Sequence, residues 1–222
     1  MYDSLRASSD PDGTIFATPF LSTTDPNLPV YSRRPIMLVG QATKGDWFLR
    51  EFDKCRDLPI KERAEECKEH TSDFQTNGSY SQFKKSDFWR FKRDLQEAIG
   101  VPVIWTNLAK IGVQNGNPRG QHLSDQSDLA ITTLKAEIRE YRSQLVVLVS
   151  GGFAVKEIVY PAFDTLRRDE WQEFQLAQED DYCLLESSKL HPTVLWFNHP
   201  RGKSSIAKNR WIEIIRSRIY VE

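Results

Sequence analysis

The chain has 222 residues, 39% of them hydrophobic and 27% charged, which suits one soluble globular domain, or at most a domain with a small appendage. No stretch approaches the roughly 18 apolar residues that a membrane-spanning helix needs. The net charge of -1 excludes a global basic field, although an enzyme that acts on DNA can use local basic patches instead.

The predicted elements alternate between short apolar strands and longer amphipathic helices. Residues 1–33 are polar, without the charged start and apolar core of a signal peptide, so we expect a cytoplasmic protein whose N-terminal arm packs on a single domain, residues 34–222. The predicted strands are residues 34–42, 101–112, 145–152 and 193–198. The predicted helices are residues 46–57, 59–70, 86–100, 127–144, 153–163 and 204–220. Residues 71–82 and 113–126 predict loops, and residues 164–192 are mixed and acidic.

This alternation indicates the fold class. Strands separated by helices imply crossover connections and a parallel sheet. Strands that are apolar throughout imply a sheet covered on both faces. We therefore predict an α/β fold, a three-layer α/β/α sandwich around a central, mostly parallel sheet of four strands.

All four predicted strands end in polar or small residues. In a parallel sheet these ends meet at one edge, where ligands bind. The residues are Gly40, Gln41, Thr106, Asn107, Ser150, Gly151, Gly152, Asn198 and His199. Amides can read the donors and acceptors of a ligand, and glycines let the backbone approach it closely.

Each of these residues also has an ordinary structural explanation. Glycine after a strand commonly serves a turn, Asn107 can be a satisfied turn residue, and His199 before Pro200 can form a rigid corner. The sequence has no G-x-G-x-x-G, Walker or G-x-S-x-G pattern. The convergence of four polar strand ends is therefore more informative than any one of them.

Cysteines and histidines give no sign of a metal or cofactor. The three cysteines include no Cys-x-x-Cys pair, and the four histidines show no H-x-x-x-H spacing. We expect reduced thiols, no zinc or iron–sulfur cluster, and metal-free chemistry in a monomer.

Four motifs in this order resemble the uracil-DNA glycosylase superfamily. They are "LVGQAT" at the first strand, "WTNLAK" at the second, "LVVLVSGGFA" at the third and "NHPRGKS" at the last. The resemblance implies base excision, in which a nucleotide is flipped out of DNA and its N-glycosidic bond is hydrolysed.

The resemblance also implies residue roles. His199 would donate to the oxygen of the departing base, a contact worth about 2.7–4 kcal/mol, and Asn107 would read the base edge. The base would be lined by Gly40, Gln41, Ala42, Thr43, Lys44, Asn107 and Asn198. DNA would be contacted by Gly151, Gly152, Arg201, Gly202, Lys203 and Ser204. No lysine is clearly placed for Schiff-base chemistry: Lys44 and Lys110 lie near the same edge, but a lysine beside a DNA site is more often a phosphate contact.

The first motif departs from the G-Q-D-P-Y-H of the best-known members. Ala42 stands where they have the water-positioning aspartate, and Lys44 where they have the tyrosine that closes the pocket against substituents on carbon 5 of the pyrimidine. Asp46 is the nearest carboxylate that could activate water, or it caps the following helix. An open pocket favours a bulky or modified pyrimidine, such as a hypermodified phage base, and hence a role in defence against invading DNA.

Three other functions stay open. One is a repair glycosylase for uracil or mismatches. Another is a catalytically inactive member that binds DNA or a partner protein, which Ala42 favours. The last is an unrelated α/β enzyme that handles nucleotides.

Overall fold

The computed structural model describes residues 34–42, 58–59, 61–62, 65–66, 69, 72, 85–113, 116–163, 172–174, 184–187 and 192–219. The predicted arm (residues 1–33) and first helix (residues 46–57) lie outside these ranges, as do Thr43, Lys44 and Asp46. The strands are β1 (Ile36–Ala42), β2 (Val103–Ala109), β3 (Leu145–Leu148), β4 (Gln172–Phe174), β5 (Leu184–Ser187) and β6 (Thr193–Trp196). The helices are α4 (Asp87–Ile99), α5 (Gly120–Ser124), α6 (Ser127–Glu140), the π-helical turn η3 (Val155–Val159), α7 (Tyr160–Ala162) and α8 (Ser205–Ile219).

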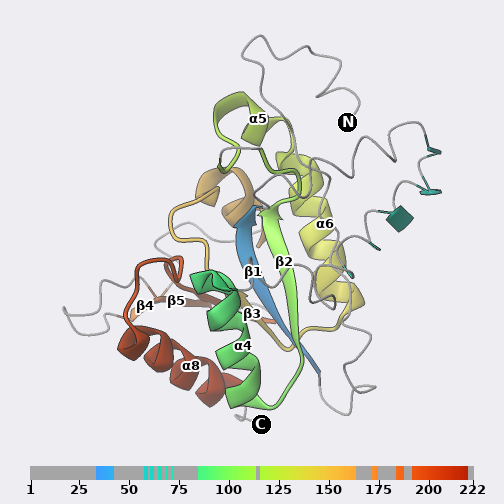
Figure 1. Cartoon of the computed structure of the whole chain (residues 1–222). Coiled ribbons are helices and arrows are strands. Elements are labelled where there is room, and N and C mark those ends of the chain that lie inside the picture. The colour runs from blue at the N-terminus through green and yellow to red at the C-terminus, as the bar shows by residue number, and fades with distance from the viewer. Residues whose placement is uncertain are drawn as a thin grey trace.

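The strands form one sheet in the order β2-β1-β3-β6-β5-β4. β2, β1, β3 and β6 pair in parallel, and helices flank the sheet (Figure 1). The predicted α/β/α sandwich with four parallel strands is therefore confirmed. Apart from Thr106 and Asn107 of β2 and Thr193 of β6, the residues through which these strands pair are apolar, as expected for a parallel sheet covered on both faces.

Two antiparallel strands, β5 and β4, extend the sheet beyond β6. No strand was predicted in residues 164–192, so the predicted sheet of four strands lacks these two. β4 has three residues and β5 has four. Segments this short give almost no periodic signal.

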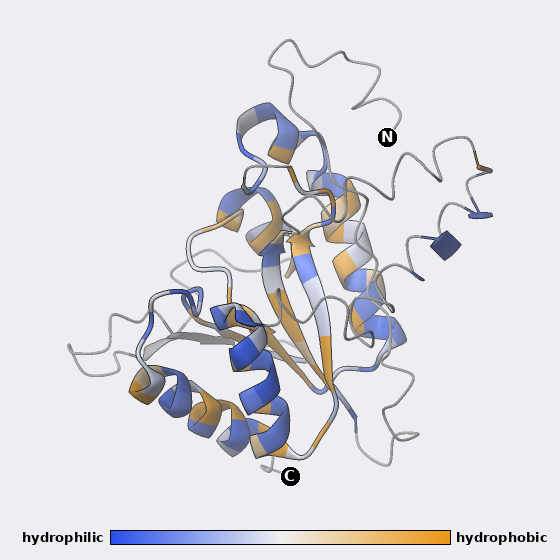
Figure 2. Ribbon diagram, viewed as in Figure 1, coloured by the Kyte–Doolittle hydropathy of each residue, from blue (hydrophilic) through white to orange (hydrophobic). Residues whose placement is uncertain are grey.

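A separate hydrophobic cluster lies on each face of the sheet. Ile36 and Leu38 of β1 pack with Phe91 and Leu95 of α4 and with Trp211 of α8. On the other face, the core includes Met37 and Val39 of β1 together with residues of α6, η3 and α7. Figure 2 shows hydrophobic stretches along the central strands and a mixture of hydrophilic and hydrophobic residues along the helices that flank them.

The ends of the helices follow from local chemistry. Ser86 caps α4 by accepting a hydrogen bond from Trp89 N at 3.4 Å, and Gly100 ends that helix with φ +62°. α6 ends at Glu140, earlier than predicted, because Arg142 adopts φ +48°. The Ser86 cap fixes the first turn of α4, which lies beside the carboxyl ends of the strands.

Candidate functional site

The four parallel strands end at one edge of the sheet, here called the rim. Gly40 of β1 pairs with Asn107 of β2. Gly151, three residues after β3, donates from its N–H to Phe197 O at 3.2 Å. An added Cβ on Gly151 would lie 3.6 Å from both Asn198 Oδ1 and His199 N. Residues from all four strand ends thus meet at the rim.

Gly40 makes room for the Asn107 side chain. A Cβ at this position would lie 2.7 Å from Asn107 Oδ1 and 3.2 Å from Phe88 Cε2. Real Cβ atoms essentially never approach an oxygen so closely. Glycine is therefore required here by the amide of the neighbouring strand and by the aromatic ring of α4.

Asn107 is almost completely buried, with 2% of its surface exposed. Its Oδ1 accepts a hydrogen bond from Trp105 Nε1 at 3.2 Å. Its Nδ2 is buried and has no hydrogen-bond partner among the described residues. Leaving such a donor unsatisfied costs about 1–3 kcal/mol, so the amide is suited to a ligand that supplies an acceptor.

Aromatic rings connect Asn107 to His199. The Phe88 ring lies 6.5 Å from the His199 ring, nearly parallel at 23°, and 6.1 Å from the Trp105 ring. Trp89 packs edge-on against Trp105 at 4.6 Å. We call Gly40, Phe88, Trp105, Asn107 and His199 the rim cluster.

His199 is held in one tautomer by the turn that follows it. Its Nδ1 accepts from the Arg201 N–H at 3.1 Å, so the proton of the neutral imidazole is on Nε2. Lys203 N donates to Pro200 O at 3.2 Å, and Gly202 adopts φ +73°, a geometry that favours glycine at the third position of a turn. The ring thus keeps Nε2–H as a donor.

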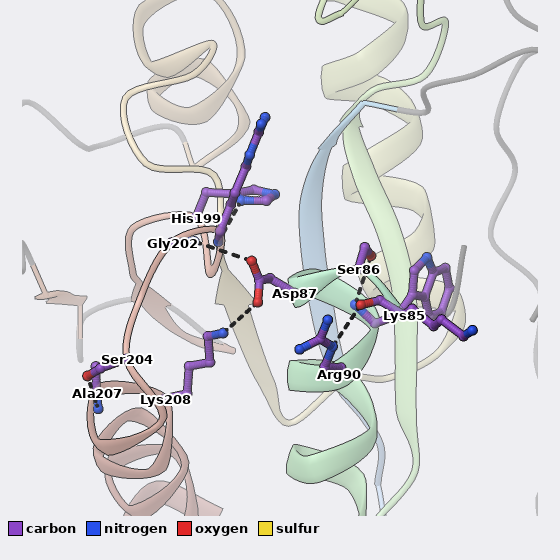
Figure 3. Close-up of polar contacts among 11 residues, drawn as sticks. Lys85, Ser86, Asp87, Arg90, His199, Gly202, Ser204, Ala207 and Lys208 are labelled. Atoms are coloured by element: carbon purple, nitrogen blue, oxygen red, sulfur yellow. Dashed lines mark hydrogen bonds and ion pairs between the residues drawn. The ribbon is translucent and has the colours of Figure 1, made fainter. Parts of the chain in front are cut away.

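Asp87 ties this turn to α4. Its Oδ2 accepts from Gly202 N at 3.3 Å, and its Oδ1 pairs with Lys208 Nζ of α8 at 2.8 Å (Figure 3). The hydrogen bond from Lys208 is the main reason why the pKa of Asp87 lies below its ordinary value. Asp87 therefore links α4, α8 and the turn that contains His199.

Gln41 lies beside the rim cluster, but both ends of its amide bind protein groups. Its Nε2 donates to Ser150 O at 2.8 Å, and its Oε1 accepts from Asn117 Nδ2, also at 2.8 Å. Gln41 thus joins β1 to the end of β3 and to the loop after β2. Asn117 Oδ1 is buried without a partner among the described residues.

The remaining predicted residues differ in exposure. Arg201, Gly202, Ser204 and Gly152 are exposed, whereas Lys203 and Asn198 are partly buried. Ala42 packs against the cluster on the α6 face.

Lys110 is not a phosphate contact. It is 1% exposed, and its Nζ lies 2.6 Å from both Glu137 Oε2 and Thr106 Oγ1. Burial lowers the pKa of Lys110, and the neighbouring Glu137 carboxylate opposes that shift. We call Thr106, Lys110 and Glu137 the buried triad.

Sequence reasoning missed Phe88, Trp105, Asp87 and Asn117 as parts of the site. Phe88 matched the apolar spacing of a helix, and Trp105 matched a buried strand. The available signals were weak: an aromatic run, "DFWRF", directly after a helix cap, and the polar loop that contains Asn117.

The described residues contain no group of three or more His, Cys, Asp or Glu that could hold a metal ion. Within the same residues, no helix is long and apolar enough to cross a membrane.

A scan against protein-family models finds no match to this chain. A sequence search of curated proteins likewise finds no match.

Proposed function

We propose that the protein is a monofunctional DNA glycosylase that flips a nucleotide out of DNA and hydrolyses its N-glycosidic bond. The observation that carries the proposal is the rim cluster. In it, a buried amide whose donor has no partner among the described residues is linked by two aromatic rings to a histidine whose Nε2 bears a proton. The order of the parallel strands also fits a uracil-DNA glycosylase-like fold.

The rim cluster suits the charge that develops when the bond breaks. The bonding electrons leave with the base, so negative charge collects on its exocyclic carbonyl oxygen O2 while the sugar becomes an oxocarbenium ion. His199 Nε2–H donates to that oxygen, water then attacks the sugar, and the proton that this water loses ends on the departed base. A donor already aimed at a developing oxyanion lowers the barrier by about 2.7–4 kcal/mol.

The turn after His199 suits a DNA backbone. Arg201 and Ser204 are exposed, and such side chains commonly bind phosphate. Ile206, in the first turn of α8, is 75% exposed. Proteins that distort DNA often insert an apolar side chain of this kind between bases, and here it would fill the space that the flipped nucleotide leaves.

The substrate we propose is a modified or bulky pyrimidine rather than plain uracil. Ala42 and Lys44 replace the aspartate and tyrosine of the motif that this first segment resembles, so the steric block against substituents on carbon 5 is lost. Hypermodified phage bases carry such substituents, and excision of these bases would damage invading DNA. A role in antiviral defence follows from this substrate.

Mass spectrometry of released bases tests the proposal. Uracil-containing DNA, unmodified DNA and several phage DNAs with modified pyrimidines are incubated with the protein and with His199→Ala. We expect modified pyrimidines from the wild type and a 100- to 1000-fold lower rate from the variant. Exclusive release of uracil or of mismatched bases would instead assign a repair glycosylase.

A DNA-binding protein without base release is the second candidate. Ala42 favours it, because alanine cannot position water. DNA binding without abasic sites on any of these substrates would support it. Stabilisation by soluble nucleotides but not by duplex DNA would instead point to another kind of nucleotide-handling enzyme.

A further inference from the structure

We propose that Trp105 determines which bases the site accepts, by fixing the orientation of the Asn107 amide. The inference rests on the proposed base excision. It narrows the substrate to bases with a keto oxygen on the edge that faces Asn107, such as substituted uracils, and excludes their 4-amino counterparts, the substituted cytosines.

Trp105 fixes the amide because an indole N–H can only donate. Trp105 Nε1 lies 3.2 Å from the amide atom of Asn107 that faces it, so that atom must be the oxygen. An amide turned by 180° would place two donors against each other in a buried site. Asn107 Nδ2 is therefore the group left without a protein partner among the described residues.

The surroundings hold both side chains in place. Trp105 is 5% exposed and packs against Trp89 at 4.6 Å and Phe88 at 6.1 Å. Asn107 itself is 2% exposed, and its Oδ1 is held by the hydrogen bond from Trp105 Nε1. The amide has little freedom to change its orientation when a ligand arrives.

A fixed amide matches one of the two pyrimidine patterns. The edge of a 4-keto pyrimidine presents an acceptor, O4, beside a donor, N3–H. Asn107 Nδ2 donates to O4, and the second lone pair of Oδ1 accepts from N3–H. A 4-amino pyrimidine presents a donor beside an acceptor, which is the pattern that only the turned amide would match.

The test compares two bases that differ only at position 4. Oligonucleotides of one sequence carry 5-hydroxymethyluracil or 5-hydroxymethylcytosine, and kcat/KM is measured for each. We expect the wild type to prefer the keto base by about 10- to 100-fold. In Trp105→Phe, which keeps an aromatic ring but loses the donor, we expect this ratio to fall about tenfold, with the rate on the amino base rising.

Trp89→Phe is the matched control, because it replaces an adjacent indole by a ring that can still pack against Trp105 and it keeps the Trp105 N–H that donates to Asn107. Trp89→Phe should keep the wild-type ratio of kcat/KM between the keto and the amino base, whatever its effect on the rate itself. An unchanged ratio in Trp105→Phe, with the far-ultraviolet circular dichroism of the wild type, would overturn the inference.

Failure of the proposed function is distinguishable from failure of this inference. If neither oligonucleotide loses a base, the base-release proposal fails, and binding is measured with the same two bases on 2′-fluoro sugars, which resist hydrolysis. Tighter binding of the keto base by the wild type, and loss of this preference in Trp105→Phe, would support the role of Trp105. Equal affinities of the wild type for both oligonucleotides would overturn it.

Discussion

Thr106 and Asn107 are neighbours on β2, yet the polar groups around them are arranged in opposite ways. Thr106 faces α6, where its Oγ1 donates to Glu137 Oε2 at 2.8 Å and accepts from Lys110 Nζ at 2.6 Å. Asn107 belongs to the rim cluster, where its Nδ2 has no partner among the described residues. Both residues are buried, at 0% and 2% exposure.

The difference separates a structural role from a ligand-binding one. In the buried triad, the charge of Lys110 is matched by Glu137, so the groups stabilise one another and need no ligand. In the rim cluster, a buried donor without a partner in the described part of the chain lowers stability until an acceptor arrives. Loss of a triad side chain should therefore change folding, and loss of a rim-cluster side chain should change base release.

The largest effect is expected from Glu137→Ala. This change leaves the buried Lys110 ammonium without its counter-charge and should lower the free energy of unfolding by about 3–5 kcal/mol. Glu140→Ala, at an exposed position of the same helix, is the control and should change it by less than about 0.5 kcal/mol. Urea unfolding measures both. Similar values for the two variants would show that the triad contributes little to stability.

His199→Ala should produce the complementary result. Loss of the Nε2–H donor should slow base release 100- to 1000-fold. The free energy of unfolding should change by less than about 1 kcal/mol, because the ring is only partly buried. Single-turnover kinetics and urea unfolding on the same preparation test both statements, and His122→Ala controls for loss of an imidazole elsewhere. A large loss of stability in His199→Ala would remove the distinction between the two regions.

Of the features that distinguish the rim cluster from the buried triad, only the local ones could be predicted from the sequence. The four apolar runs indicated the parallel strands, and the polar residues that end them pointed to Asn107 and His199. The buried triad could not be predicted, because Lys110 and Glu137 are 27 residues apart and a lysine after a strand gives no sign of burial. Lys110 was therefore wrongly assigned to phosphate.

Phe88, Trp105 and Asp87 were missed for a related reason. Phe88 and Trp105 have ordinary apolar positions in a helix and a strand, and their contacts with His199 and Asn107 depend on how α4 packs beside the rim. Asp87 binds Gly202 across 115 residues of sequence. Periodicity reports which face of an element is buried, but not which side chain of another element meets it.

Gly40→Ala should disturb the rim cluster from the backbone. The new Cβ would lie 2.7 Å from Asn107 Oδ1 and 3.2 Å from Phe88 Cε2, so the amide or the ring must move. We expect the free energy of unfolding to fall by about 1–3 kcal/mol, the usual cost of overpacking, and base release to fall at least tenfold. Gly152→Ala, where a Cβ meets nothing within 4 Å, is the control for stability. Equal stability of the two variants would mean that Asn107 adapts freely, which its hydrogen bond to Trp105 argues against.

The smallest effect is expected at Asp87, which connects the His199 turn to the scaffold. Its pKa lies below the ordinary value of 3.8, chiefly because of the hydrogen bond from Lys208. A carboxylate with a lowered pKa stabilises the fold above its unfolded pKa and loses that contribution as the pH falls through the folded pKa. The contribution is therefore present above the ordinary value of 3.8 and is lost as the pH falls below it, through the lower pKa of the folded state.

For Asp87→Asn, we expect a stability about 0.5 kcal/mol below the wild type at pH 7, the usual size for a partly exposed pair, and a shallower decline between pH 5 and pH 2.5. Asp94→Asn, at an exposed carboxylate of the same helix, is the control for the loss of one negative charge from α4. Thermal unfolding across this pH range distinguishes the two. Asp87 Oδ2 accepts from Gly202 N, so Asp87 acts on His199 only through the turn that follows it. Asp87→Asn should therefore reduce base release severalfold at most. A loss as large as that of His199→Ala would place Asp87 in the reaction itself rather than in the support of the turn.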